Sequence, residues 1–151
     1  MARKLVQKSI SIQATAEVIW QIITKDEYNV EWLAEFGEGN IAQTDWQEGS
    51  KAIFIDNSKV GLIAVIRESR PFEKILIQNI GLITDGKEDY ESADAIESHE
   101  FFEQYFLIPE GDATRMSVEV NVEDGFYDEI SDCWERALAN IKLQAELQAN
   151  R

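Results

Sequence analysis

The sequence predicts an α+β fold in which a curved antiparallel sheet of about seven strands encloses a long C-terminal helix. Two observations carry this prediction. Alternating strand patterns separated by short polar turns fill residues 40–122, and apolar residues at helical spacing follow the first strand and recur at the C-terminus. A sheet with one apolar face needs a cover, and the terminal helix is the only segment long enough to supply it.

The N-terminal segment predicts one strand and two short helices. Val6, Lys8, Ile10 and Ile12 form one alternating set, which indicates the strand. Thr15 is placed to cap a helix whose apolar residues are Val18, Ile19, Ile22 and Ile23. Asp26 can cap a second helix that ends near Leu33, ahead of two glycines.

The central segment predicts six further strands joined mostly by short polar turns, and therefore an antiparallel meander. They are expected over Asn40–Asp45, Ser50–Asp56, Lys59–Glu68, Lys74–Leu82, His99–Ile108 and Thr114–Val122. The interval Asp85–Glu97 is dominated by carboxylates and predicts a long acidic loop.

The last segment, from about Tyr127 to Asn150, predicts a long amphipathic helix that lies across the sheet. Its apolar stripe consists of Ile130, Trp134, Ala137, Leu138, Ile141 and Ala145. The order of elements is thus one strand, two helices, six strands and one helix.

Composition sets bounds on the class of protein. A chain of 151 residues with 44% hydrophobic and 28% charged residues predicts one folded domain over residues 1–151. The net charge of -15 argues against nucleic acid and anionic membranes as partners. No leader pattern or long apolar run is present, and the lone Cys133 cannot form an internal disulfide, so we expect a cytoplasmic protein.

Chemical motifs are sparse. His99 and Cys133 are the sole residues of their types, and neither a metal-ligand spacing nor a phosphate-loop glycine pattern occurs. We therefore expect no metal, no cofactor and no catalytic residue. Polar pairs interrupt two apolar strands, Gln78-Asn79 and Glu103-Gln104, and alternation sends one member of each pair inward unless a bulge intervenes.

Several strings along the chain resemble the SRPBCC or START-like superfamily, and within it the homologues of the activator of heat-shock-protein-90 ATPase. The strings are Ile10-Ser11-Ile12, Val18-Ile19-Trp20, Trp46-Gln47-Glu48-Gly49-Ser50, Glu68-Ser69-Arg70-Pro71-Phe72, Tyr105-Phe106-Leu107, Ala113-Thr114-Arg115-Met116 and Trp134-Glu135-Arg136-Ala137-Leu138. Ala113 replaces the family's usual glycine. The resemblance implies a helix-grip fold with a hydrophobic cavity between sheet and helix.

The leading hypothesis is a non-enzymatic domain that binds a small hydrophobic, lipid-like or amphipathic ligand in this cavity. Inward strand positions and the helix stripe predict a lining of Phe54, Leu62, Ala64, Ile75, Tyr105, Met116, Trp134 and Leu138. Alternation is compatible with either strand parity facing inward, and core packing is the alternative explanation for each residue.

Two other hypotheses follow from the resemblance. One is a co-chaperone-like domain whose acidic surface contacts a chaperone-type protein partner. The other is a cyclase-like enzyme that works within the cavity, for which the candidate polar residues are Arg67, Glu103, Tyr105 and Arg115.

Overall fold

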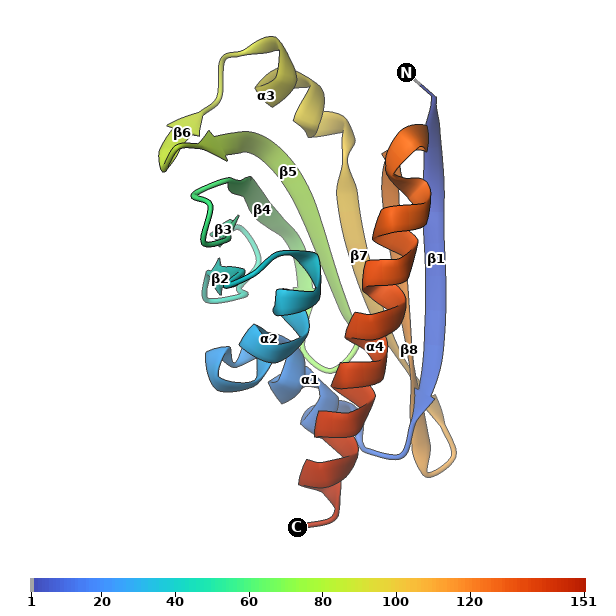
Figure 1. Ribbon diagram of the computed structural model, residues 1–151. Coiled ribbons are helices and arrows are strands. Elements are labelled where there is room, and N and C mark those ends of the chain that lie inside the picture. The colour runs from blue at the N-terminus through green and yellow to red at the C-terminus, as the bar shows by residue number, and fades with distance from the viewer. Residues whose placement is uncertain (1) are drawn as a thin grey trace.

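The computed structural model describes residues 2–151 and has the predicted α+β architecture, an open, curved antiparallel sheet with helices on its concave side (Figure 1). The strands are β1 (Arg3–Ile12), β2 (Ile41–Gln43), β3 (Lys51–Ile55), β4 (Gly61–Arg70), β5 (Lys74–Thr84), β6 (Lys87–Asp89), β7 (Phe102–Glu110) and β8 (Ala113–Glu123). The helices are α1 (Ala16–Thr24), α2 (Asp26–Leu33), α3 (Ala93–Glu97) and α4 (Tyr127–Ala149), with short 3-10 turns η1 (Ala34–Phe36), η2 (Ser98–Glu100) and η3 (Asp124–Phe126).

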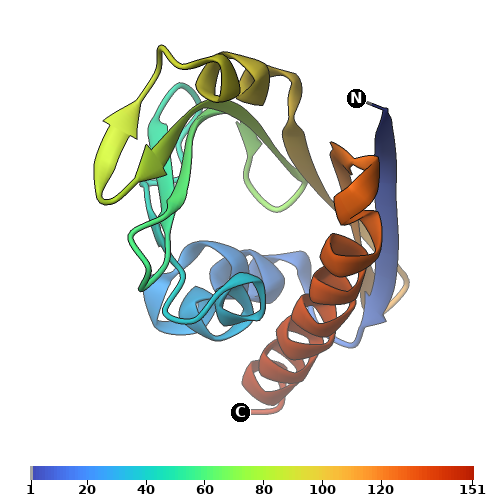
Figure 2. The same ribbon diagram turned by 45° about the horizontal axis from the view of Figure 1, so that its top comes forward.

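The sheet has the strand order β1-β8-β7-β5-β4-β3-β2, and β6 pairs with β5. The first strand joins the last, from Arg3 opposite Glu123 to Ile12 opposite Thr114. The register between β4 and β5 shifts twice, between Ile63 and Ala64 and between Ile66 and Glu68. Such irregularities add twist and bend a sheet, which fits the strong curvature seen in Figure 2. The predicted meander and fold class are confirmed.

The acidic interval after β5 is structured, so the prediction of a long loop is wrong. Asp89 accepts hydrogen bonds from the backbone N–H groups of Glu91 and Ser92 at 3.1 Å, which stabilises the turn before α3. Ser92 in turn caps α3 by accepting from the N–H of Ala95. The density of charged residues does not reveal these bonds at the start of α3, nor the pairing of β6 with β5.

The terminal helix covers only part of the sheet, contrary to the prediction that it lies across it. α4 packs chiefly against β1 and also contacts α1 and α2 (Figures 1 and 2). The Lys142 ammonium donates to the Ser11 carbonyl at 2.8 Å, which holds the helix to the end of β1. The buried stripe consists of Trp134, Ala137, Leu138, Ile141 and Ala145. Because α4 stays on the β1 side, it leaves the concave face of the central strands partly uncovered.

Candidate functional site

A cavity of about 810 Å³ lies between the concave face of the sheet and the helices. Strands β4, β5, β7 and β8 form one wall, and α2, η1 and the N-terminal half of α4 form the other. In Figure 2 the sheet and α1, α2 and α4 form a ring around this region. The volume falls in the range of roughly 300–1,000 Å³ that is usual for small-molecule sites.

An aromatic cluster closes the helix side of the cavity. The Trp134 ring lies 5.0 Å from Phe36, 5.4 Å from Tyr105 and 5.9 Å from Trp32, measured between ring centroids. Ile130 and Trp134 are four residues apart on α4, so both reach the same wall. The indole N–H of Trp32 donates to the Ile22 carbonyl at 3.0 Å, whereas that of Trp134 has no partner in residues 2–151. The cluster gives a rigid, apolar surface.

One polar pair, Glu103 and Tyr105, lies on this apolar wall. The two residues alternate along β7 and share a face, and the Tyr105 hydroxyl donates to Glu103 Oε2 at 2.9 Å. Ile77 and Val120 lie opposite Glu103 on the neighbouring strands. Burial raises the pKa of Glu103, and the hydrogen bond from Tyr105 opposes that rise. Burial, together with the nearby carboxylate, raises the pKa of Tyr105 well above its usual value.

The inward members of the two polar pairs noted in the sequence are Asn79 and Glu103, and both line the cavity. Gln78 does not line it, and its amide donates to the Phe101 carbonyl at 3.2 Å. Alternation alone would separate Asn79 from Leu82, yet both line the cavity because the β4–β5 register shifts between them.

The predicted lining residues divide into two groups. Phe54, Leu62, Tyr105 and Trp134 line the cavity. Ala64, Ile75, Met116 and Leu138 do not line it and are packed in the continuous hydrophobic core, each at most 3% exposed.

Lining residues that the prediction omitted lie both on strands, such as Ile77 and Val120, and on helices and turns, such as Ile130 in α4 and Phe36 in η1. For Ile130, the sequence held a usable signal, because its spacing of four residues from Trp134 places both on the same face of the helix. No signal in the sequence pointed to Phe36, because η1 has no periodic pattern of its own.

The candidate polar residues of the enzyme hypothesis are not assembled in one place. Arg67 is exposed, and Arg115 pairs with Glu110 at 2.8 Å on the surface, so neither lines the cavity. His99 is exposed, with Nε2 2.9 Å from the Ile80 carbonyl oxygen. Cys133 is buried, and burial raises the pKa of its thiol. Within residues 2–151 no three His, Cys, Asp or Glu side chains are grouped to hold a metal.

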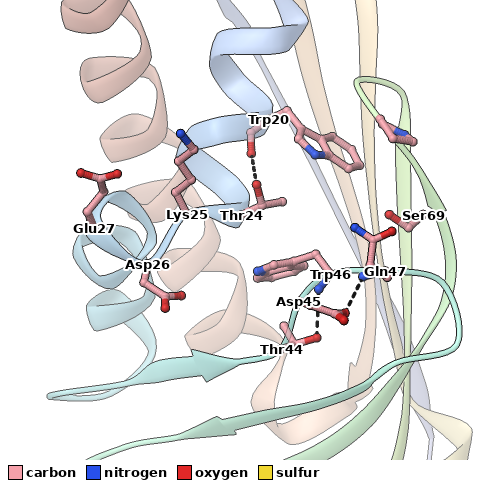
Figure 3. Close-up of a pocket in the computed structure, with 11 residues that line it drawn as sticks. Trp20, Thr24, Lys25, Asp26, Glu27, Thr44, Asp45, Trp46, Gln47 and Ser69 are labelled. Carbon is pink, nitrogen blue, oxygen red and sulfur yellow. Dashed lines mark hydrogen bonds between the residues drawn. The ribbon is translucent and has the colours of Figure 1, made fainter.

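A second, smaller hollow of about 450 Å³ lies where α1 and α2 meet the β2–β3 loop and the β4–β5 turn (Figure 3). Trp46 is one of its lining residues, has a left-handed backbone φ of 62° and is 4% exposed. The Thr44 hydroxyl accepts from the Trp46 N–H at 3.1 Å, and Asp45 accepts from the Gln47 N–H at 2.9 Å. These two hydrogen bonds stabilise the conformation of the β2–β3 loop.

Comparison with known proteins gives matches among solved structures. No family model and no curated protein matches the sequence. The Aha1 dimer from Colwellia psychrerythraea superposes with a TM-score of 0.70 at 17% identity, over 97% of this chain and 98% of that one. CalU16 from Micromonospora echinospora gives a TM-score of 0.62 at 17% identity, over 94% and 81% of the two chains.

DynU16, from the dynemicin biosynthetic locus, gives a TM-score of 0.69 at 11% identity over 96% of this chain. The match covers 48% of DynU16, so the present chain spans about half the length of that protein. None of the helices in residues 2–151 is long and apolar enough to cross a membrane. At these identities the likeness establishes the fold, and the resemblance found in the sequence is confirmed at that level. The chain has a helix-grip fold similar to that of Aha1.

Proposed function

We propose that the protein is a non-enzymatic binding domain that takes up a small apolar or amphipathic molecule in the cavity beside α4. The observation that carries the proposal is a cavity of about 810 Å³ with a largely apolar and aromatic lining. An empty apolar space of this size lacks the packing contacts that stabilise a filled core. Its presence therefore favours a role in ligand binding. Phe54, Leu62, Tyr105 and Trp134 would contact the ligand, while Ala64, Ile75, Met116 and Leu138 would support these walls from the core.

The test uses a neutral fluorescent probe, N-phenyl-1-naphthylamine, together with a variant that fills the cavity. Leu62 lines the cavity and is 38% exposed, so Leu62→Trp adds volume there without overpacking the closed core. Ile108→Trp is the matched control, because Ile108 lies on β7, is 47% exposed and does not line the cavity.

We expect the probe to bind the wild-type protein and the Ile108→Trp variant alike, and Leu62→Trp to weaken binding by about tenfold or more. Thermal melts of all three proteins check that folding is retained. A probe that fails to bind the wild type, or that binds all three proteins equally, would count against the cavity as a ligand site. Native mass spectrometry of freshly purified protein would reveal a ligand that is retained through purification.

A second candidate function is contact with a basic, chaperone-type protein partner. The net charge of -15 and the fold shared with Aha1 favour it. Association through an acidic surface weakens steeply with salt, whereas uptake of a neutral probe does not. The cyclase-like alternative has less support, because only Glu103 and Tyr105 of its four candidate residues line the cavity.

A further inference from the structure

The charged residues that line the cavity are all of one sign. They are Asp56, Asp94, Glu97, Glu103 and Glu123, and no Lys, Arg or His of the described chain lines the cavity with them. Four of them lie on a rim formed by the end of β8, by α3 and by the residue after β3, and Glu103 alone is on the inner wall of β7. These rim elements are in the upper part of Figure 1.

Counterions reduce this charge only partly. Arg3 lies 3.2 Å from Glu97, but it also pairs with Glu100, so one cation is shared between two carboxylates. Asp56 accepts a hydrogen bond from the Ser58 N–H at 2.8 Å. Hydrogen bonding by Ser58 lowers the pKa of Asp56, which keeps that rim group ionised. The entrance therefore keeps a negative potential at neutral pH.

On the inner wall, Glu103 has an unused acceptor. Tyr105 donates to Oε2, and Oε1 has no partner among residues 2–151. The opposing residues Ile77 and Val120 cannot donate with their side chains. A carboxylate on an apolar wall is stabilised most by a ligand that brings a hydrogen-bond donor or a positive charge. A ligand that carries its own carboxylate is bound less favourably there, because the two negative charges repel each other.

We propose that the cavity selects amphipathic amines, whose apolar part lies against the aromatic cluster and whose ammonium group bonds Glu103, and that it rejects fatty-acid-like anions. The inference rests on the proposed function and deepens it by assigning the ligand class. Uptake proceeds past the acidic rim, which attracts the cation and repels the anion before either enters.

The experiment compares three molecules with the same chain, namely dodecylamine, 1-dodecanol and dodecanoate, each kept below its micelle concentration. Each displaces N-phenyl-1-naphthylamine from the full chain at pH 7, in 20 mM and in 150 mM salt. We expect the order amine, alcohol, acid, with the amine at least about tenfold tighter than the acid. The preference should persist at 150 mM salt, because contacts inside the cavity are screened less than surface charges.

Two isosteric variants test which carboxylate causes the preference for the amine. Glu103→Gln should bring the affinities of amine and alcohol together. Glu119→Gln removes the same charge from a residue of β8 that does not line the cavity, and it should leave the preference as in the wild type.

Dodecanoate that binds as tightly as dodecylamine would overturn the inference while leaving the proposed function standing, provided that the alcohol binds. A preference that disappears at 150 mM salt, or that Glu119→Gln weakens as much as Glu103→Gln does, would also overturn it by assigning the effect to the outer surface. If neither the neutral probe nor any of the three molecules binds, the proposed function itself fails.

Discussion

Truncation of Trp134 to alanine tests the packing of α4 against the rest of the molecule. The indole is 1% exposed and contacts Trp32, Phe36 and Tyr105, which lie on α2, on η1 and on β7. A single side chain therefore joins three elements that are distant in sequence. Removing it should destabilise the protein strongly.

The expected cost follows from the structure. Buried Trp→Ala changes cost about 3–5 kcal/mol. Two features place the cost for Trp134 near the lower end of this range. One side of the ring borders a cavity that already exists. In addition, its N–H has no hydrogen-bond partner in the described chain, so the mutation removes an unsatisfied buried donor. We expect a loss of about 3 kcal/mol, which for a chain of this length lowers the Tm by roughly 6–12 °C.

The assay is urea unfolding followed by far-UV circular dichroism, because tryptophan fluorescence would change with the mutation itself. Trp134→Phe is the matched variant, since it keeps an aromatic ring and removes the unpartnered N–H; we expect it to cost less than about 1.5 kcal/mol. An alanine variant that loses less than about 1 kcal/mol, at an unchanged m-value, would refute this account of the aromatic cluster. So would a phenylalanine variant as unstable as the alanine one.

Three further predictions concern other parts of the chain. Thr15→Ala should cost about 0.5–2 kcal/mol in a urea melt, because the Thr15 hydroxyl caps α1 by accepting from the Val18 N–H at 3.3 Å; an unchanged midpoint would contradict this. Burial raises the pKa of Glu103, so the native state binds this proton more tightly than the unfolded chain does, and the side chain's contribution to stability is lost as pH rises above the unfolded value of about 4.3. The free energy of unfolding of Glu103→Gln should therefore rise relative to that of the wild type between pH 4 and pH 7. A difference between the two proteins that does not vary with pH would argue against a raised pKa for Glu103. Burial also raises the pKa of the Cys133 thiol, so iodoacetamide at pH 7.5 should alkylate it much more slowly in the native protein than in urea; equal rates would show that the thiol is accessible and reactive.

Patterns local in the sequence predicted the elements well because they arise from contacts between near neighbours. The Thr15 cap, the alternation of β1 and the stripe of α4 all lie where they were expected. The interval Asp85–Glu97 was misjudged because Asp89 stabilises the turn before α3 and Ser92 caps that helix, roles that charge density alone does not reveal.

For the cavity, the sequence by itself determined that a curved sheet and a long helix would share an apolar interior, because periodicities of two and 3.6 dictate which residues need cover. It also determined that polar residues would interrupt two inner strands. Only the tertiary structure decided that α4 lies along β1 and leaves space over the central strands. Likewise, only the register shift in β5 decided that Leu82 joins Asn79 on the wall of that space, and only the pairing of β7 decided that Glu103 faces it. The physical reason is that helix position and strand register depend on contacts between distant segments, such as Lys142 with Ser11, and no local pattern encodes these contacts.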